Sequence, residues 1–398
     1  MVLDEKQGKL YDGIGGDPPV FSADSRRLGY SAYAGGKWFV VVNEEERGRY
    51  EGVGKGSIVF SPNSRRVAYV SQTGGRFCTV VDERDGPPYD NIGEGPPIFS
   101  PDSQRVGYVA KVGNRAVVVI DGKEGTYYDS IGTAPVFSPD SKRVAYVANK
   151  HGKWVLVHDG EESKPYDLIG KGSPIFSADS SRLLYEVAVG GKRSLVVDGK
   201  EGKLYDYLAK GMFHFSPDSK KVAYVAATGR KQFLVLDGQE GKPYDGIVEN
   251  TLSFSPDSKR IAYGAITGNE QRVVVDRDEG KLYDGIGSML VFSPDSRRVA
   301  FGGVEDGHRC FVVVDGIEQD SYDDIGKGTL VFSPDSQKVA YVAGAAGRQC
   351  VVVNASRGKS YEALINIGGG RLVFDSPKTL HYLVQKGTDL CLVEEKLA

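Results

Sequence analysis

The chain has 398 residues, with 50 Lys plus Arg against 53 Asp plus Glu, which gives a formal net charge of −3. This balance excludes a broadly basic nucleic-acid-binding or membrane-surface protein, although it leaves room for a local charged patch. No apolar run approaches the roughly 18 residues of a membrane helix, and the first residues lack the basic and apolar regions of a secretory signal. The sequence as it stands therefore predicts a cytoplasmic protein, or a periplasmic or extracellular one if a signal peptide was removed.

Two short motifs repeat along the whole chain about every 39 residues. Ten copies of each indicate ten repeat units, and internal repeats at this spacing are typical of propellers and solenoids. The first motif is Phe-Ser-Pro-Asp-Ser with small variations, and its copies begin at Phe21, Phe60, Phe99, Phe137, Phe176, Phe215, Phe254, Phe292 and Phe332, with a scrambled copy at Phe374. The second motif is Tyr-Asp or Tyr-Glu, at Tyr11, Tyr50, Tyr89, Tyr128, Tyr166, Tyr205, Tyr244, Tyr283, Tyr322 and Tyr361.

Each unit predicts four short strands and no helix. In the unit that spans residues 135–170, hydrophobic alternation and turn residues place strands at 135–138, 143–148, 154–157 and 164–169, which we name A, B, C and D. Strand B is apolar on both faces, as expected for a strand that lies between two neighbouring sheets. Four strands in about 40 residues, repeated in this way, are typical of a β-propeller blade.

Prolines indicate where strand A lies in the blade. Because proline cannot donate a backbone hydrogen bond, it is confined to the edge of a sheet. The innermost strand of a propeller blade is such an edge, so prolines at the start of strand A place this strand next to the central channel. The prolines in question are Pro18, Pro96, Pro97, Pro135 and Pro174.

The two ends of the chain predict how a ring would close. Residues 8–15 form a strand D with no strands A to C before it, whereas residues 370–398 supply strands A, B and C and then stop. We therefore expect the N-terminal strand to complete the last blade, so that residues 1–398 form a single closed propeller of ten four-stranded blades. Two five-bladed rings would need two such closures, yet the fifth and sixth units join at ordinary spacing without a linker.

The repeat resembles the TolB-type, WD-like propeller family, in which a Phe/Trp-Ser-Pro-Asp-Gly turn precedes an Ile-Ala-Phe/Tyr strand. The resemblance covers essentially the whole chain and implies a β-propeller that serves as a protein-interaction scaffold. The chain departs from the family in its ten units and in having Ser where the family has Gly, for example at Ser64, Ser141 and Ser258. The nucleophile pattern Gly-x-Ser-x-Gly is absent, and no peptidase domain follows the repeats.

The sequence offers no catalytic, cofactor-binding or metal-ligating set. None of the five histidines has metal-ligand spacing with a second His or with Cys, and the Asp-Gly-x-Glu-Gly segments at 121–125, 198–202 and 237–241 suit hairpin turns better than calcium loops. His214 is unusual because it replaces an aliphatic residue in strand A, and we expect a structural role for it. The other histidines are His151, His158, His308 and His381.

The cysteines and the Tyr-Asp motif also favour structural roles. The cysteines lie on strand C of separate blades, too far apart for a disulfide, so free thiols are predicted. A once-per-molecule site should break the repeat, whereas the Tyr-Asp motif recurs in every unit. We therefore expect its Tyr to pack between blades and its Asp to accept hydrogen bonds from backbone or from a neighbouring Arg. The four cysteines are Cys78, Cys310, Cys350 and Cys391.

One position gives the chain a local excess of positive charge. Strands alternate in direction, so the B–C hairpins of all blades share one face, and the residue that ends this hairpin is basic in eight of ten units. The C–D loops on the opposite face are acidic. The basic residues are Lys37, Arg76, Arg115, Lys153, Lys192, Lys231, Arg309 and Arg348, and the two exceptions are Glu270 and Asp389.

These observations favour a non-catalytic scaffold that binds a protein or other acidic partner over one face or the channel mouth. The partner could be another copy of the chain stacked face to face, and nucleic acid is disfavoured because the basic positions lack interleaved aromatic residues. The same charge could instead be a solubility feature of a duplicated turn. Two alternatives stay open: a propeller lyase or hydrolase with a site near Glu305, Asp306, His308, Glu249 and Asn250, and a recently amplified or engineered repeat protein without a selected ligand.

Overall fold

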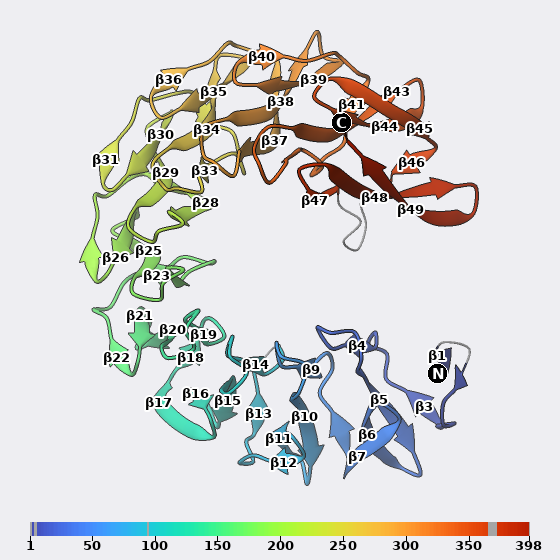
Figure 1. The fold of residues 1–398 in the computed structure, drawn as a ribbon. Helices are drawn as coiled ribbons and strands as arrows, with labels where there is room; N and C mark the ends of the chain where they lie inside the picture. The colour runs from blue at the N-terminus through green and yellow to red at the C-terminus, as the bar shows by residue number, and fades with distance from the viewer. Residues whose placement is uncertain (1, 4–5, 94, 365–371, 398) are drawn as a thin grey trace. The chain divides into compact units, whose positions relative to one another are not determined.

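The computed structural model describes residues 2–3, 6–93, 95–364 and 372–397. These residues form strands and turns without any helix, and they group into two compact units, Met1–Gly202 and Lys203–Ala398. Each unit holds five antiparallel sheets of four or five strands that follow one another along the chain (Figure 1), and the first unit also holds a two-stranded hairpin. The prediction of an all-β propeller with ten blade-like sheets is confirmed. The closure of all ten into a single ring stays a prediction.

The first unit begins with a two-stranded hairpin, β1 (Val2–Leu3) and β2 (Lys6–Gln7), and continues with sheets 1 to 5. Sheet 1 holds β3 (Gly13–Ile14), β4 (Val20–Phe21), β5 (Leu28–Ala34), β6 (Lys37–Val42) and β7 (Glu45–Tyr50). Sheet 2 holds β8 (Gly52–Val53), β9 (Val59–Phe60), β10 (Val67–Thr73), β11 (Arg76–Val81) and β12 (Arg84–Asp85). Sheet 3 holds β13 (Asn91–Ile92), β14 (Ile98–Phe99), β15 (Val106–Val112), β16 (Arg115–Ile120) and β17 (Lys123–Tyr128). Sheet 4 holds β18 (Ser130–Ile131), β19 (Val136–Phe137), β20 (Val144–Lys150), β21 (Lys153–His158) and β22 (Glu161–Glu162). Sheet 5 holds β23 (Leu168–Ile169), β24 (Ile175–Phe176), β25 (Leu183–Val189), β26 (Lys192–Val197) and β27 (Lys200–Glu201).

The second unit holds sheets 6 to 10 in the same pattern. Sheet 6 holds β28 (Tyr207–Phe215), β29 (Val222–Thr228), β30 (Lys231–Leu236) and β31 (Gln239–Glu240). Sheet 7 holds β32 (Gly246–Ile247), β33 (Ser253–Phe254), β34 (Ile261–Thr267), β35 (Glu270–Val275) and β36 (Asp278–Glu279), and sheet 8 holds β37 (Gly285–Phe292), β38 (Val299–Glu305), β39 (Arg309–Val314) and β40 (Ile317–Glu318). Sheet 9 holds β41 (Asp324–Ile325), β42 (Val331–Phe332), β43 (Val339–Ala345), β44 (Arg348–Val353) and β45 (Ser356–Tyr361). Sheet 10 holds β46 (Ala363–Leu364), β47 (Val373–Ser376), β48 (Thr379–Lys386) and β49 (Asp389–Lys396).

The predicted strand D is divided between two sheets, which corrects the sequence-based prediction for residues 164–169. Tyr166 forms a bridge to Trp154 in strand C of its own sheet. The next residues cross over, and Leu168 and Ile169 pair with Ala188 and Val187 in strand B of sheet 5. A segment this short cannot be assigned to one sheet from its hydrophobic pattern, because its two halves bury their side chains against different neighbours.

Strand A is correspondingly built from two short pieces. In sheet 4, β18 and β19 both pair with β20, one with each half of that strand, and neither has a second partner among the described strands. The prolines precede the second piece, as predicted for an edge strand. The strands B and C predicted at 143–148 and 154–157 are observed with slightly later or wider bounds.

At the N-terminus the same division assigns Gly13 and Ile14 to sheet 1, where they pair with Tyr33 and Ala32. The expectation that all of residues 8–15 add to the last sheet is therefore wrong for these two residues. For residues 8–12, addition to sheet 10 stays a prediction. Of the expected closing segment 370–398, residues 370, 371 and 398 lie outside the described residues.

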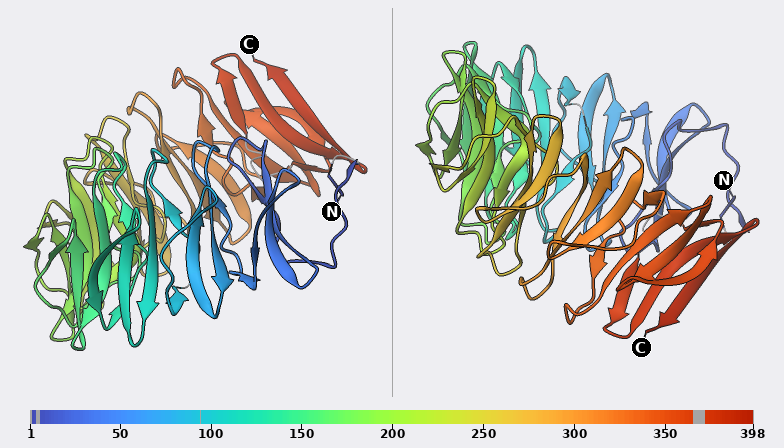
Figure 2. Two further views of the ribbon diagram at one scale, coloured as in Figure 1. Left: turned by 90° about the horizontal axis from the view of Figure 1, so that it is seen from below. Right: turned by 90° about the horizontal axis from the view of Figure 1, so that it is seen from above.

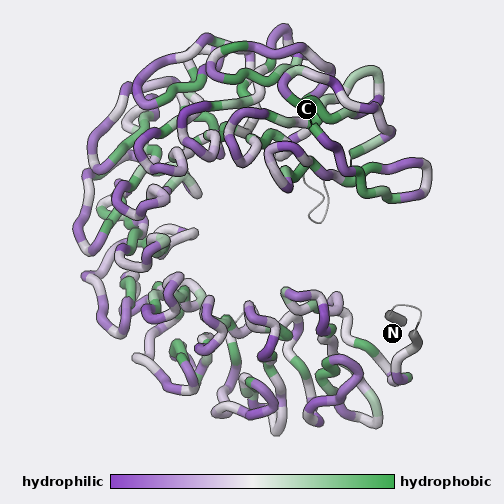
Figure 3. The backbone as a smooth tube through the Cα atoms, in the orientation of Figure 1, coloured by the Kyte–Doolittle hydropathy of each residue, from purple (hydrophilic) through white to green (hydrophobic). Residues whose placement is uncertain are grey.

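Consecutive sheets of each unit lie next to one another (Figure 2). The core lies between them, and strands B and C supply most of its buried apolar residues. Figure 3 shows the hydropathy of the residues along the backbone. The Tyr of the Tyr-Asp motif packs edge-on against an aromatic residue of the next sheet; the rings of Tyr128 and Tyr146 are 6.3 Å apart. The Tyr128 hydroxyl also donates to Glu162 of that sheet at 3.0 Å. The predicted packing of this Tyr between blades is thus confirmed for the sheets of each unit.

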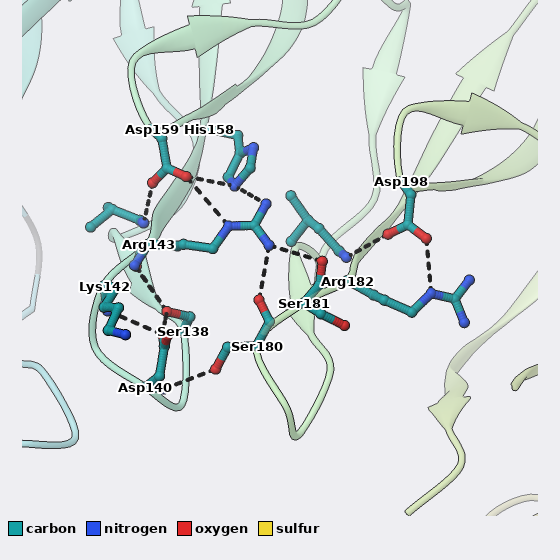
Figure 4. A network of polar contacts seen from close by, with 12 residues as sticks. Ser138, Asp140, Lys142, Arg143, His158, Asp159, Ser180, Ser181, Arg182 and Asp198 are labelled. Carbon is teal, nitrogen blue, oxygen red and sulfur yellow. Dashed lines mark hydrogen bonds and ion pairs between the residues drawn. The ribbon is translucent and has the colours of Figure 1, made fainter. Parts of the chain in front are cut away.

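The Ser-Pro-Asp-Ser turns join neighbouring sheets through hydrogen bonds (Figure 4). The backbone N–H of Asp140 donates to the hydroxyl of Ser180 in the next turn at 2.9 Å. Arg143 spans the same gap, because it donates to the backbone carbonyls of Ser180 and Ser181 at 2.9 and 3.1 Å and lies over the Phe176 ring. The turns therefore hold the sheets in register with one another at this end of the strands.

This network explains why Ser stands where the resembling family has Gly. Ser64, Ser141 and Ser258 have φ of 61°, 66° and 62°, in the left-handed region that glycine occupies most readily. Each of these hydroxyls, however, accepts a backbone N–H from the preceding sheet. A glycine would suit the backbone at this position but would leave that N–H without its acceptor.

Candidate functional site

The eight basic residues of the B–C hairpins all occupy the first position of strand C. Within each unit they lie at the end of the sheets opposite the Ser-Pro-Asp-Ser turns, because strand B runs from the turn to the hairpin. Their alignment, predicted from the repeat, therefore holds within each unit. They begin the strands β6, β11, β16, β21, β26, β30, β39 and β44, as Lys37, Arg76, Arg115, Lys153, Lys192, Lys231, Arg309 and Arg348.

Several of these cations are held by nearby carboxylates and carbonyls. Arg76 pairs with Asp90 at 3.3 Å and Lys153 with Asp167 at 2.6 Å, and in both pairs the side chains are about half-exposed. Lys231 and Asp245 repeat this geometry at 2.6 Å in the second unit. Arg115 and Arg348 instead donate to the backbone carbonyls of Tyr127 and Ser360, and Arg309 lies near Glu305 and Asp306.

The carboxylates in these pairs belong to the Tyr-Asp motif, which the sequence assigned to a structural role. Asp167 accepts the backbone N–H of Gly190 at 2.9 Å and thereby caps the B–C hairpin of sheet 5, while its second oxygen receives Lys153. The Lys153 ammonium, aided by this N–H, lowers the pKa of Asp167 below its usual range. The predicted acceptor role is confirmed, and the net positive charge at this end is smaller than the basic residues alone suggest.

At the outer edge of the sheets, the acidic C–D loops are also paired. Lys164, two residues before Tyr166, reaches Glu201 of the next sheet at 2.7 Å. Lys203 and Glu240 form the same pair in the second unit at 2.7 Å. Charge counting by face missed these pairs because the Lys and the Glu lie 37 residues apart and meet only when consecutive sheets pack.

The histidines lie in separate environments. His158 contacts Asp159 at 3.0 Å and Arg143 at 2.5 Å, and burial, followed by the nearby Arg143, outweighs Asp159 and lowers its pKa. Burial also lowers the pKa of His214 in β28. Within the described residues no group of three or more His, Cys, Asp or Glu side chains could hold a metal ion. All four cysteines have free thiols.

The residues of the enzyme alternative lie in two neighbouring sheets. Glu305 accepts Lys281 at 2.7 Å, and His308 contacts the backbone carbonyl of Asp306 through Nδ1 at 2.5 Å. The first contact joins the end of β38 to the segment that follows β36, and the second lies within the hairpin between β38 and β39. Glu249 and Asn250 lie in the loop between β32 and β33 of sheet 7. These side chains therefore lie at a strand end and on loops of two sheets, and the contacts described do not pair a nucleophile with a base.

The interface between sheets 8 and 9 departs from the repeat in a way that the sequence analysis missed. A cavity of about 250 Å³ lies there, bordered by Gly302, Val304, Cys310, Asp324 and Leu330 among others. The signal was present in the sequence, because Gly302 stands where strand B of most other sheets has Val. A single Gly in a strand of a glycine-rich chain does not, however, show whether a neighbouring side chain fills the space beside it.

No family model matches the chain, and no curated protein is similar to it in sequence. Solved structures are similar to it at low identity. A eukaryotic initiation factor is 12% identical with a TM-score of 0.41, over 84% of this chain and 96% of that one. The β-propeller domain of the Trilobed protease from Pyrococcus furiosus is 14% identical with a TM-score of 0.29, over 67% and 94%. TolB from Acinetobacter baumannii is 17% identical with a TM-score of 0.25, over 67% and 80%. The propeller fold of this chain rests on its own sheet topology.

Among the described residues there is no helix long and apolar enough to cross a membrane.

Proposed function

We propose that this protein is a non-catalytic interaction scaffold that binds an acidic protein partner across the B–C hairpins. The observation that supports this best is the array of cations at the first position of strand C. The side chains of Arg76, Lys153, Lys231 and Arg309 are each about half-exposed, so they are held in place and still reach solvent. Regularly spaced cations of this kind suit a surface that carries several carboxylates.

The ion pairs at this end do not prevent such binding. An exposed pair contributes only about 0–1 kcal/mol to stability, so a partner carboxylate can replace or share the contact at little cost. Arg76 has further N–H donors beyond the one that faces Asp90, because a guanidinium carries five. The existing pairs orient the cations, which reduces the side-chain entropy lost when a partner binds.

The opposite end of the strands supplies a matched control. Arg26, Arg65 and Lys142 follow the Ser-Pro-Asp-Ser turns and are exposed, as are Arg76, Arg115 and Lys153 of the hairpins. Replacing three of these residues by Gln removes the same charge from the same unit but from the other end of the sheets. Any difference in affinity between the two triple variants then results from where the removed charges lie and not from the change in net charge.

The test measures binding of a fluorescent poly-glutamate peptide by anisotropy at low and high salt. We expect the R76Q/R115Q/K153Q variant to bind about tenfold more weakly than the native chain and the R26Q/R65Q/K142Q variant to bind within about twofold of it. Affinity should also fall as salt rises, because the charges are exposed. Equal affinities of the two variants, or no binding by the native chain, would contradict the proposal. Sedimentation of the same proteins tests the self-stacking alternative.

A further inference from the structure

Several sheets share a local packing rule next to strand A. A glycine follows its first piece, and the space beside that glycine is filled by the fourth residue of strand B. A Cβ added to Gly54 would lie 2.9 Å from the Val70 Cβ, and one added to Gly93 would lie 2.9 Å from the Val109 Cβ. Gly326 and Val342 repeat the arrangement at 3.0 Å. In these sheets the glycine is required because the valine of strand B occupies the space that a side chain at the glycine position would need.

Sheet 8 breaks this rule on both sides at once. Gly287 and Gly302 face each other, and the nearest atoms to a Cβ added to Gly287 would be those of the Gly302 backbone, at 3.5 Å or farther. Sheet 7 shows that a glycine in strand B does not by itself leave a space. There Gly264 is matched by Val248, whose Cβ would be 2.9 Å from an added Cβ, so the volume is conserved by exchange of the two residues.

A third substitution enlarges the same space. The second residue of strand C is Phe77 in sheet 2 and Trp154 in sheet 4, and the Trp154 ring covers Gly132 there. In sheet 8 this position is Cys310, which is much smaller. The cavity of about 250 Å³ at this interface is bordered on the opposite side by Ile325 and Leu330 of sheet 9. Its wall is therefore mainly apolar and backbone.

The border of the cavity carries a carboxylate that the other units lack. Asp324 follows the Tyr-Asp motif, at a position that is Gly, Asn, Ser, Leu, Tyr or Ala in the remaining units. Burial and the charge of Asp324 raise the pKa of the Cys310 thiol, which is consistent with this carboxylate lying near the cavity wall. Lys327 borders the cavity as well. An apolar cavity beside an exposed carboxylate is complementary to a ligand with an apolar body and a cationic end.

We propose that the cavity between sheets 8 and 9 binds a small apolar amine, whose apolar part fills the space beside Gly302 and whose ammonium pairs with Asp324. This site is independent of the hairpin cations and adds a small-molecule function to the scaffold. The facing glycines Gly287 and Gly302 distinguish this interface from those of sheets 2, 3 and 9, where valine stands opposite the glycine.

The test uses phenethylamine as the probe and 2-phenylethanol as its neutral counterpart, with binding to the full chain followed by calorimetry or ligand-observed NMR. G302V restores the residue found in sheets 2, 3 and 9, and we expect it to weaken phenethylamine binding at least tenfold. D324N should weaken binding of the amine but not of the alcohol. D306N removes an equal charge from the neighbouring hairpin outside the cavity wall and should leave binding unchanged.

Two further measurements distinguish a filled cavity from an unfolded protein. Thermal unfolding shows whether G302V is folded, and C310F fills the same cavity from strand C, with the residue type that sheet 2 carries there. Unchanged affinity for phenethylamine in a folded G302V or C310F variant would overturn the proposal. No binding by the native chain up to millimolar probe, or an equal loss of both probes in D324N, would overturn it as well.

Discussion

Both ends of the sheets carry charged residues, but the two ends use them differently. At the turn end, Arg105 donates to the carbonyls of Ser141 and Lys142 in the next sheet, at 3.1 and 2.9 Å, and pairs with Asp121 at 3.0 Å. At the hairpin end, Arg76 makes an exposed pair with Asp90 and leaves donors toward solvent. The turn end therefore joins the sheets, whereas the hairpin end is available for a partner.

The largest expected effect tests this comparison directly. We expect Arg105→Ala to lower the free energy of unfolding by about 2–3 kcal/mol, because it leaves carbonyls of the next sheet and Asp121 without a charged donor. Arg76→Ala at the hairpin end should cost less than about 1 kcal/mol, since it removes only an exposed pair. Urea unfolding of the two variants provides the measurement. Similar losses in both would show that the two ends do not differ in this way.

A smaller effect is expected at the serine of the turn. Ser141→Ala removes the acceptor of the Asp102 N–H at a buried position and should cost about 1–2 kcal/mol. Ser141→Gly loses the same hydrogen bond, but it relieves the left-handed backbone and should be more stable than the Ala variant by about 1 kcal/mol. The midpoints of urea unfolding rank the three proteins. An Ala variant as stable as the native chain would remove the proposed role of the hydroxyl.

The turn aspartates predict a dependence on acid pH. The Ser100 hydroxyl and the Gln104 N–H lower the pKa of Asp102, and Asp140 and Asp257 have corresponding donors. A carboxyl whose pKa is lower in the folded state contributes stability above its unfolded pKa, near about 4, and this contribution is lost as pH falls through the folded pKa. Native stability should therefore decrease below about pH 4.

In the turn of sheet 2, asparagine occupies the position that is aspartate in most other turns. This natural exchange suggests a variant in which the turn aspartates are replaced by asparagine. Asn63 accepts the Ser61 hydroxyl at 2.7 Å and the Arg65 N–H at 3.0 Å, so the turn keeps its hydrogen bonds without a titrating group. The D102N/D140N/D257N variant should lose less stability between pH 5 and pH 3 than the native chain. Between pH 7 and pH 5, the urea-unfolding midpoint of the variant should change no more than that of the native chain. Parallel pH profiles would contradict this assignment.

The sequence predicted most of the fold because the repeat supplies ten versions of one local pattern. The alternation of residues 144–150, the Pro-Asp turn and the glycine hairpin act over a few residues, so their structure follows from short-range physics. The ionic partners of the hairpin cations were not predicted in the same way. Lys153 and Asp167 are 14 residues apart, and their contact depends on a segment that leaves one sheet for the next.

The local sequence pattern was enough to predict the all-β repeat, its spacing, its strands B and C, and the alignment of the basic residues at one position. The packing of consecutive sheets shows in addition that the segment after Tyr166 pairs with the following sheet, that Lys164 meets Glu201, and that Gly287 lies opposite Gly302. These features depend on which side chains of different sheets share the same space. Packing and ion pairing between distant residues fix that outcome, and a local pattern does not contain it.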